Sequence, residues 1–147
     1  MKRASATLAL VALLALPPAL EAQSGPHDNL NVVFRSISTT WARDNASGLA
    51  RFLSPRGVSI DVSDGPMGPL GERQAVALLR QVFDQGETMA VHAGMLERVG
   101  GSPPRAFGAI TWVVLPVGTQ LPVRRTVYFG LELDDEGWRI SEIRLIR

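Results

Sequence analysis

Four side chains in this sequence could take part in acid–base chemistry: Asp61, Asp64, His92 and Tyr128. A carboxylate in an apolar pocket can remove a proton from carbon, while a phenol or an imidazole stabilises the oxygen anion that forms. Such a site works only when the acid, the base and the donor converge on one small space. No stretch around these residues matches a motif for this chemistry, so the folded elements must decide whether the four side chains meet.

The alternation of side chains along the predicted strands argues against such a site. Asp61 points away from its apolar neighbours Ile60 and Val62, and Tyr128 points away from Val127 and Phe129. His92 likewise lies on the side of its strand opposite Val91 and Ala93. We therefore expect these three residues at solvated or interface positions, and we assign no catalytic residue.

Several other chemistries are excluded or disfavoured by residue types. The chain has no cysteine, which excludes disulfides, thiol catalysis and cysteine metal sites. His27 and His92 lie far apart, so we predict no metal site. The glycine- and proline-rich stretch 65–71 lacks the Lys-Ser/Thr of a phosphate loop, and no G-x-S-x-G elbow occurs. We expect no cofactor.

The first 22 residues are typical of a secretory signal peptide. Lys2 and Arg3 precede an apolar run at 8–16 that ends at Pro17 and Pro18, and small residues around Ala22 supply a cleavage region. The run is shorter than the roughly 20 apolar residues of a membrane-spanning helix. We predict a signal peptide at 1–22, export to the periplasm or the exterior, and one domain at 23–147.

The predicted mature chain carries no net charge. Removing Lys2, Arg3 and Glu21 from the chain's 15 basic and 14 acidic residues leaves equal numbers of each. A neutral domain has no electrostatic attraction to polyanions, so we expect neither nucleic acid nor a membrane as its partner.

The N-terminal half of the predicted domain carries helical periodicity. Leu30, Val33, Phe34, Ile37 and Trp41 form one apolar stripe, which predicts a helix at 27–43 with Asp28 as a suitable cap. A short helical turn follows at 49–53, then a strand at 58–62 and a loop at 63–71. A second stripe predicts a helix at 72–85.

The C-terminal half changes to a period of two, which is typical of strands. Strands are predicted at 89–95, 107–115, 123–133 and 138–146, joined by turn-forming segments rich in glycine, proline and aspartate. Such short links favour an antiparallel meander. In the last strand the apolar parity changes between Ile140 and Ile143, which indicates a β-bulge near Ser141 and Glu142.

These elements predict an α+β fold in which N-terminal helices pack on one face of a curved, cone-shaped antiparallel sheet. The order of elements carries a family resemblance, together with the stretches TWARDNASGLARFL, VSIDV, LGERQAVALLRQVF and VYFGLELDDEGWRISEIRLI. The sequence resembles the nuclear transport factor 2-like superfamily, closest to an uncharacterised bacterial family of small exported domains of unknown function. The resemblance implies a cone whose mouth can hold a small molecule.

Two functions fit this fold. One is a non-catalytic binding or assembly module; the other is a small isomerase, dehydratase or cyclase that uses acid–base residues at the cone mouth. The missing convergent set of acid, base and donor favours the first. The expected ligand is a small apolar molecule or a partner segment, and the expected lining comes from apolar residues of the predicted core stripes, which would otherwise be plain core: Phe34, Ile37, Trp41, Phe83, Phe129 and Trp138.

The strand at 107–115 is apolar on both faces, since Ile110, Trp112 and Val114 share one parity while Phe107, Ala109 and Val113 share the other. A strand covered on one face only should alternate with polar residues. We therefore expect a homodimer formed through the sheet face away from the helices, around Trp112, as the resemblance also implies.

Overall fold

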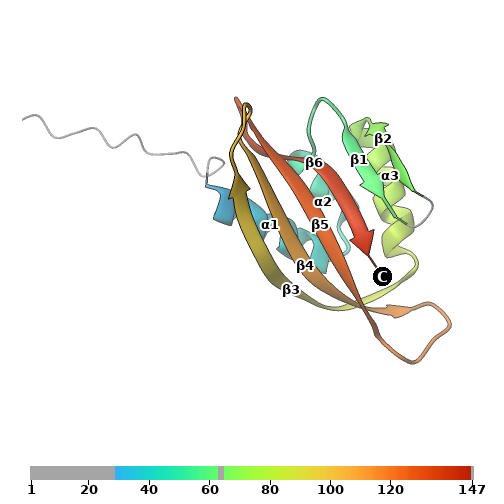
Figure 1. Ribbon diagram of the computed structural model, residues 1–147. Coiled ribbons are helices and arrows are strands. Elements are labelled where there is room, and N and C mark those ends of the chain that lie inside the picture. Colours follow the sequence, from blue (N-terminus) through green and yellow to red (C-terminus); the bar gives the residue numbers. More distant parts are fainter. Residues whose placement is uncertain (1–28, 63–64, 147) are drawn as a thin grey trace, which may run out of the picture.

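The computed structural model describes residues 29–62 and 65–146 and has three α-helices, one short 3₁₀ helix and six strands (Figure 1). The helical elements are α1 (Leu30–Ala42), α2 (Ala46–Leu49), η1 (Ala50–Phe52) and α3 (Glu72–Phe83). The strands are β1 (Val58–Asp61), β2 (Pro66–Leu70), β3 (Gly86–Val99), β4 (Arg105–Pro116), β5 (Val123–Asp134) and β6 (Gly137–Ile146). The predicted α+β fold class is confirmed.

Helix α1 begins three residues later than the sequence predicts. Its N-cap is Asn29, whose side-chain oxygen accepts hydrogen bonds from the backbone N–H groups of Asn31 and Val32 at 3.1 and 3.4 Å. Asn is as good a cap as Asp because a short side-chain oxygen reaches the free N–H groups of the first turn. The expected cap, Asp28, lies outside the described residues.

All six strands form one sheet in the order β2-β1-β6-β5-β4-β3. The predicted meander β3–β6 is antiparallel throughout, whereas β1 pairs in parallel with β6. The prediction of a loop at 63–71 was wrong for 66–70, because this segment is the edge strand β2. Pro66 and Pro69 are tolerated there, since an edge strand has one side on which no N–H donor is needed.

Bulges decide which side chains of the long strands face the helices. Gly130 pairs with Glu142 and Leu131 with Ile140, so Ser141 is the extra residue of the predicted bulge in β6. Strand β3 has two further shifts, at Met89 and at Gly94–Met95, that the sequence did not indicate. As a result Met89 and Met95 are each 52% exposed, and the simple alternation expected for 89–95 was wrong.

The helices cover one face of the curved sheet, here called the inner face, and the core lies between them (Figure 1). Its centre is Trp41 of α1, whose ring makes edge-on contacts with the rings of Phe83, Trp112 and Phe129 at centroid distances of 4.9, 5.6 and 5.5 Å. Such edge-to-face pairs add about 0.5–1.5 kcal/mol each beyond area burial. On the other sheet face, here called the open face, no helix of residues 29–62 and 65–146 packs.

Candidate functional site

The three acid–base candidates that the structure describes all lie on the open face of the sheet. Tyr128 stands between the buried residues Val127 and Phe129 and is 37% exposed. His92 is exposed and pairs with Thr111, while the carboxylate of Asp61 lies 3.9 Å from the guanidinium of Arg144. Their expected departure from the helix-facing core is confirmed. Asp64 lies outside the described residues.

The open face does not bring these candidates into one site. Arg144 pairs with Tyr128 across the strands and also faces Asp61, so two of the candidates flank one arginine. His92 belongs to a different row, that of Thr111 and Thr126. In residues 29–62 and 65–146, no group of three or more histidine, aspartate or glutamate side chains could hold a metal ion.

The six residues expected to line a ligand site are buried together in the core. Ile37, Trp41 and Phe129 have no exposed surface, and the other three, Phe34, Phe83 and Trp138, are at most 5% exposed. Phe34 also packs edge-on against Phe129, with 6.2 Å between ring centroids. Ligand binding by this set stays a prediction, and the packing contacts of these residues build the core.

Trp112 lies on the inner face, not on the open face where we expected an exposed apolar patch around it. Its ring is 0% exposed because Trp41 and Phe83 cover it, and its indole N–H donates to the Thr88 hydroxyl at 2.7 Å. The location of the expected dimer contact at Trp112 was therefore wrong. The open-face residues of β4 are those of the other parity, namely Phe107, Ala109, Thr111 and Val113.

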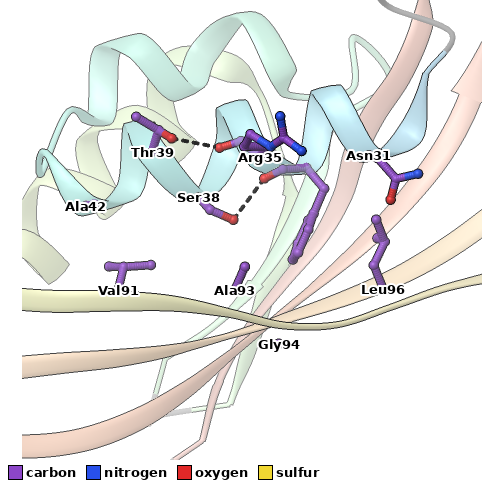
Figure 2. Close-up of a pocket in the computed structure, with 10 residues that line it drawn as sticks. Asn31, Arg35, Ser38, Thr39, Ala42, Val91, Ala93, Gly94 and Leu96 are labelled. Atoms are coloured by element: carbon purple, nitrogen blue, oxygen red, sulfur yellow. Dashed lines mark hydrogen bonds between the residues drawn. The ribbon is translucent and has the colours of Figure 1, made fainter.

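A groove of about 460 Å³ runs between α1 and β3 on the inner face (Figure 2). This α1–β3 groove is lined by Asn31, Phe34, Arg35, Ser38, Thr39, Ala42, Val91, Ala93, Gly94 and Leu96. Figure 2 shows the side chains of Val91, Ala93 and Leu96 rising from the strand toward the helix. The volume lies within the usual range of small-molecule sites, about 300–1,000 Å³.

The two walls of the groove differ in chemistry. The β3 wall is apolar, whereas α1 presents Asn31, Arg35, Ser38 and Thr39. The Ser38 and Thr39 hydroxyls donate to the carbonyl oxygens of Phe34 and Arg35 at 2.8 and 2.9 Å, so their protons are engaged within the helix. Arg35 is the single ionisable side chain in the lining.

Sequence reasoning missed this groove because it followed only the core stripe of α1. Asn31, Arg35, Ser38 and Ala42 recur at the helical spacing i, i+4, i+7 and i+11, which puts them on one face beside that stripe. This polar stripe looks like an ordinary solvated face in the sequence. On the wall opposite it, Val91 and Ala93 have the parity that the sequence predicts, whereas Leu96 reaches the same face only through the bulge at Gly94–Met95.

A second hollow of about 310 Å³ lies where α1, η1 and the start of β6 meet. Its charged lining residues Arg51, Glu136 and Arg139 contact one another: the guanidinium of Arg139 lies 2.7 Å from the carboxylate of Glu136 and donates to the carbonyl oxygen of Arg51. Arg51 in turn stacks over the Phe52 ring, with 4.7 Å to its centroid. These contacts join η1 to the β5–β6 hairpin and indicate a structural cluster.

Comparison with solved structures places the fold. A ketosteroid isomerase-like protein from Erwinia carotovora atroseptica superposes with a TM-score of 0.63 at 14% identity, over 79% of this chain and 91% of that chain. A DUF4783 family protein from Bacteroides ovatus gives 0.61 at 13% identity, over 75% and 90%. The NTF2-like design Rd1NTF2_04 with long sheet gives 0.62 at 15% identity, over 80% and 100%.

The chain has the nuclear transport factor 2-like fold. The expected resemblance is thereby confirmed for the fold. It is confirmed for the fold alone, because identities of 13–15% carry no activity from one protein to another. No protein-family model matches the sequence, and no curated protein sequence matches it.

Proposed function

We propose that this nuclear transport factor 2-like chain is an exported, non-catalytic binding module whose ligand site is the α1–β3 groove. One observation carries the proposal: the groove is lined by neutral and apolar side chains plus Arg35, while Asp61, His92 and Tyr128 lie on the opposite face of the sheet. A small apolar molecule can bury its surface against β3 without meeting a general acid or base. Of the six residues expected to line a ligand, Phe34 belongs to this groove.

The alternative function is a small isomerase, dehydratase or cyclase. The ketosteroid isomerase-like neighbour supports it only through the shared fold. An arginine is protonated at any physiological pH and cannot act as a general base. Catalysis in the groove would therefore need a base that its described lining does not contain.

Blocking the groove tests the binding function. Ala93→Trp puts a large side chain into the groove, and Val99→Trp adds the same side chain on the same strand outside it. With the neutral dye Nile red as the probe, we expect fluorescence enhancement in the original protein and in Val99→Trp, and a loss of at least tenfold in affinity in Ala93→Trp. Equal binding by all three proteins would sink the proposal.

Export is proposed from the sequence at 1–22, which lies outside the described residues. Among those described, no helix is both long and apolar enough to cross a membrane. Mass spectrometry of the protein from its native host should find a mature N-terminus near Gln23. Recovery of the intact chain from the cytoplasm would contradict the proposal.

We also propose that the chain forms a homodimer through the open face of the sheet. Phe107 of β4 is 41% exposed there and Tyr128 of β5 is 37% exposed. These two aromatic residues flank Ala109, which pairs with Tyr128 across the strands. Apolar side chains gathered on a helix-free sheet face are typical of an interaction surface.

A further inference from the structure

We infer that the α1–β3 groove takes an amphipathic anion, a molecule with an apolar body and a carboxylate head. This inference rests on the proposed binding function and specifies the chemical class of the ligand. The apolar body would lie along Val91, Ala93 and Leu96. The carboxylate would be bound at the helix wall by Arg35, with the Asn31 amide as a second donor.

The spacing of the two donors suits one small head group. Asn31 and Arg35 are four residues apart in α1, so they are neighbours on the helix surface, about one turn from each other. Both belong to the groove lining and both are exposed, which leaves them accessible from solvent. An arginine can hold a carboxylate through two parallel N–H···O bonds, and an amide NH₂ group can donate to a remaining lone pair.

The guanidinium of Arg35 is available for a ligand. It makes no ion pair or hydrogen bond with any side chain in the part of the chain that the structure describes. Several arginines of the sheet behave differently: Arg105 faces Glu132 at 3.3 Å, and Arg144 faces Glu142 at 2.6 Å. Within residues 29–62 and 65–146, no carboxylate therefore neutralises the positive charge of Arg35.

Among the residues that the structure describes, no acidic side chain lines the groove. Helix α1 contains no Asp or Glu, and the two acidic residues of β3, Glu87 and Glu97, pair with Leu115 and Phe107, which lie on the open-face parity of β4. The carboxylates thus point away from the groove while Arg35 lines it. This segregation gives the groove a positive local charge, although the predicted mature chain is neutral overall.

The side chains on the β3 wall determine how much of the ligand must be apolar. Val91, Ala93 and Leu96 offer no hydrogen-bond donor or acceptor, so a polar group placed against them would lose its hydration without compensation. The Ser38 and Thr39 hydroxyl protons are already donated within α1. A ligand that is polar along its whole length is therefore disfavoured, and an apolar ligand that also carries an anionic head gains the contact with Arg35.

A pair of ligands that differ only in the head group tests this inference. Octanoate and octan-1-ol share one apolar chain, and their binding is measured by titration calorimetry and by displacement of Nile red. We expect octanoate to bind about tenfold more tightly than octan-1-ol, in keeping with the strength of a hydrogen-bonded charge. Arg35→Gln should abolish this preference, while Arg43→Gln, which removes an arginine at the end of the same helix outside the lining, should retain it.

The outcomes separate the two levels of the argument. Equal affinities for octanoate and octan-1-ol, or a preference that survives Arg35→Gln, would overturn the anionic head group and leave groove binding standing. Failure of both ligands to bind overturns this inference. If Ala93→Trp binds Nile red as tightly as the original protein, the binding function itself is overturned. Because Arg35 is exposed, its replacement should leave the circular dichroism spectrum unchanged.

Discussion

At the scale of single residues, a short chain of hydrogen bonds connects the buried sheet to the end of α1. The indole N–H of Trp112 donates to the hydroxyl of Thr88, and that hydroxyl donates to the carboxylate of Asp44. Asp44 follows α1 with a positive φ of 51°, a conformation that Asp tolerates better than most residues. The three residues are 24 and 44 positions apart in sequence, so no local pattern could have indicated this contact.

Replacing Thr88 with Val tests the role of this chain in stability. Valine keeps the shape of threonine but leaves the indole N–H of the fully buried Trp112 without an acceptor. An unsatisfied buried donor costs about 1–3 kcal/mol. We expect the free energy of unfolding, measured by urea denaturation, to fall by that amount.

The control for this prediction is Thr39→Val on α1. Thr39 is exposed and donates only to a carbonyl of its own helix, so its loss should change stability by no more than about 0.5 kcal/mol. Equal effects of the two substitutions would show that the Thr88 hydroxyl does not satisfy Trp112 in solution.

At the scale of elements, the sequence predicted best those helices and strands whose apolar residues all lie on one buried face. The apolar spacing of α1 and α3 and the parity change of β6 each have a direct physical cause, so the helices and the bulge at Ser141 could be predicted. Strand β2 could not, because Pro66 and Pro69 argue against a strand unless its position at the sheet edge is already known.

The candidate site escaped prediction for a related reason. The bulge at Gly94–Met95 of β3 brings Leu96 to the face of Val91 and Ala93, and the two bulges leave Met89 and Met95 exposed. In β6 the bulge shows as a change of apolar parity, whereas in β3 the apolar residues Met89, Val91, Ala93 and Met95 alternate without a break and so give no sign of either bulge. The same limitation affected Trp112, since both parities of β4 are apolar and only the folded sheet shows which one faces the helices.

At the scale of the whole molecule, the open face has the size of a stable interface. Six strands about 4.8 Å apart, with about ten residues rising 3.3 Å each, span roughly 800 Å². A standard interface buries about the same area on each partner. Several charges on or beside this face are paired within the chain, through Arg56–Glu132, Arg105–Glu132 and Arg144–Glu142.

The open face also has a hollow that could accept a side chain of a second copy, lined by Phe107 with Gly130, Leu131 and the polar residues Ser59, Arg105, Glu132, Ser141 and Glu142. Phe107, which is 41% exposed, borders this hollow of about 390 Å³, which also includes Gly130, its cross-strand partner. In a two-fold dimer each protomer presents the same surface, so the Phe107 ring of one copy can enter the hollow of the other and the reverse contact follows by symmetry.

Phe107→Glu therefore tests dimerisation through the open face, because it puts a charge at the centre of the proposed contact, where it would lose its hydration without a partner. We expect the original protein to be a dimer by light scattering at micromolar concentration and the variant to be a monomer with an unchanged circular dichroism spectrum. Val117→Glu is the matched control, since Val117 is 74% exposed in the loop between β4 and β5 and lies outside the face. It should remain a dimer. A monomeric original protein, or a Phe107→Glu variant that stays dimeric, would mean that this face is not the contact and that its aromatic side chains serve another partner.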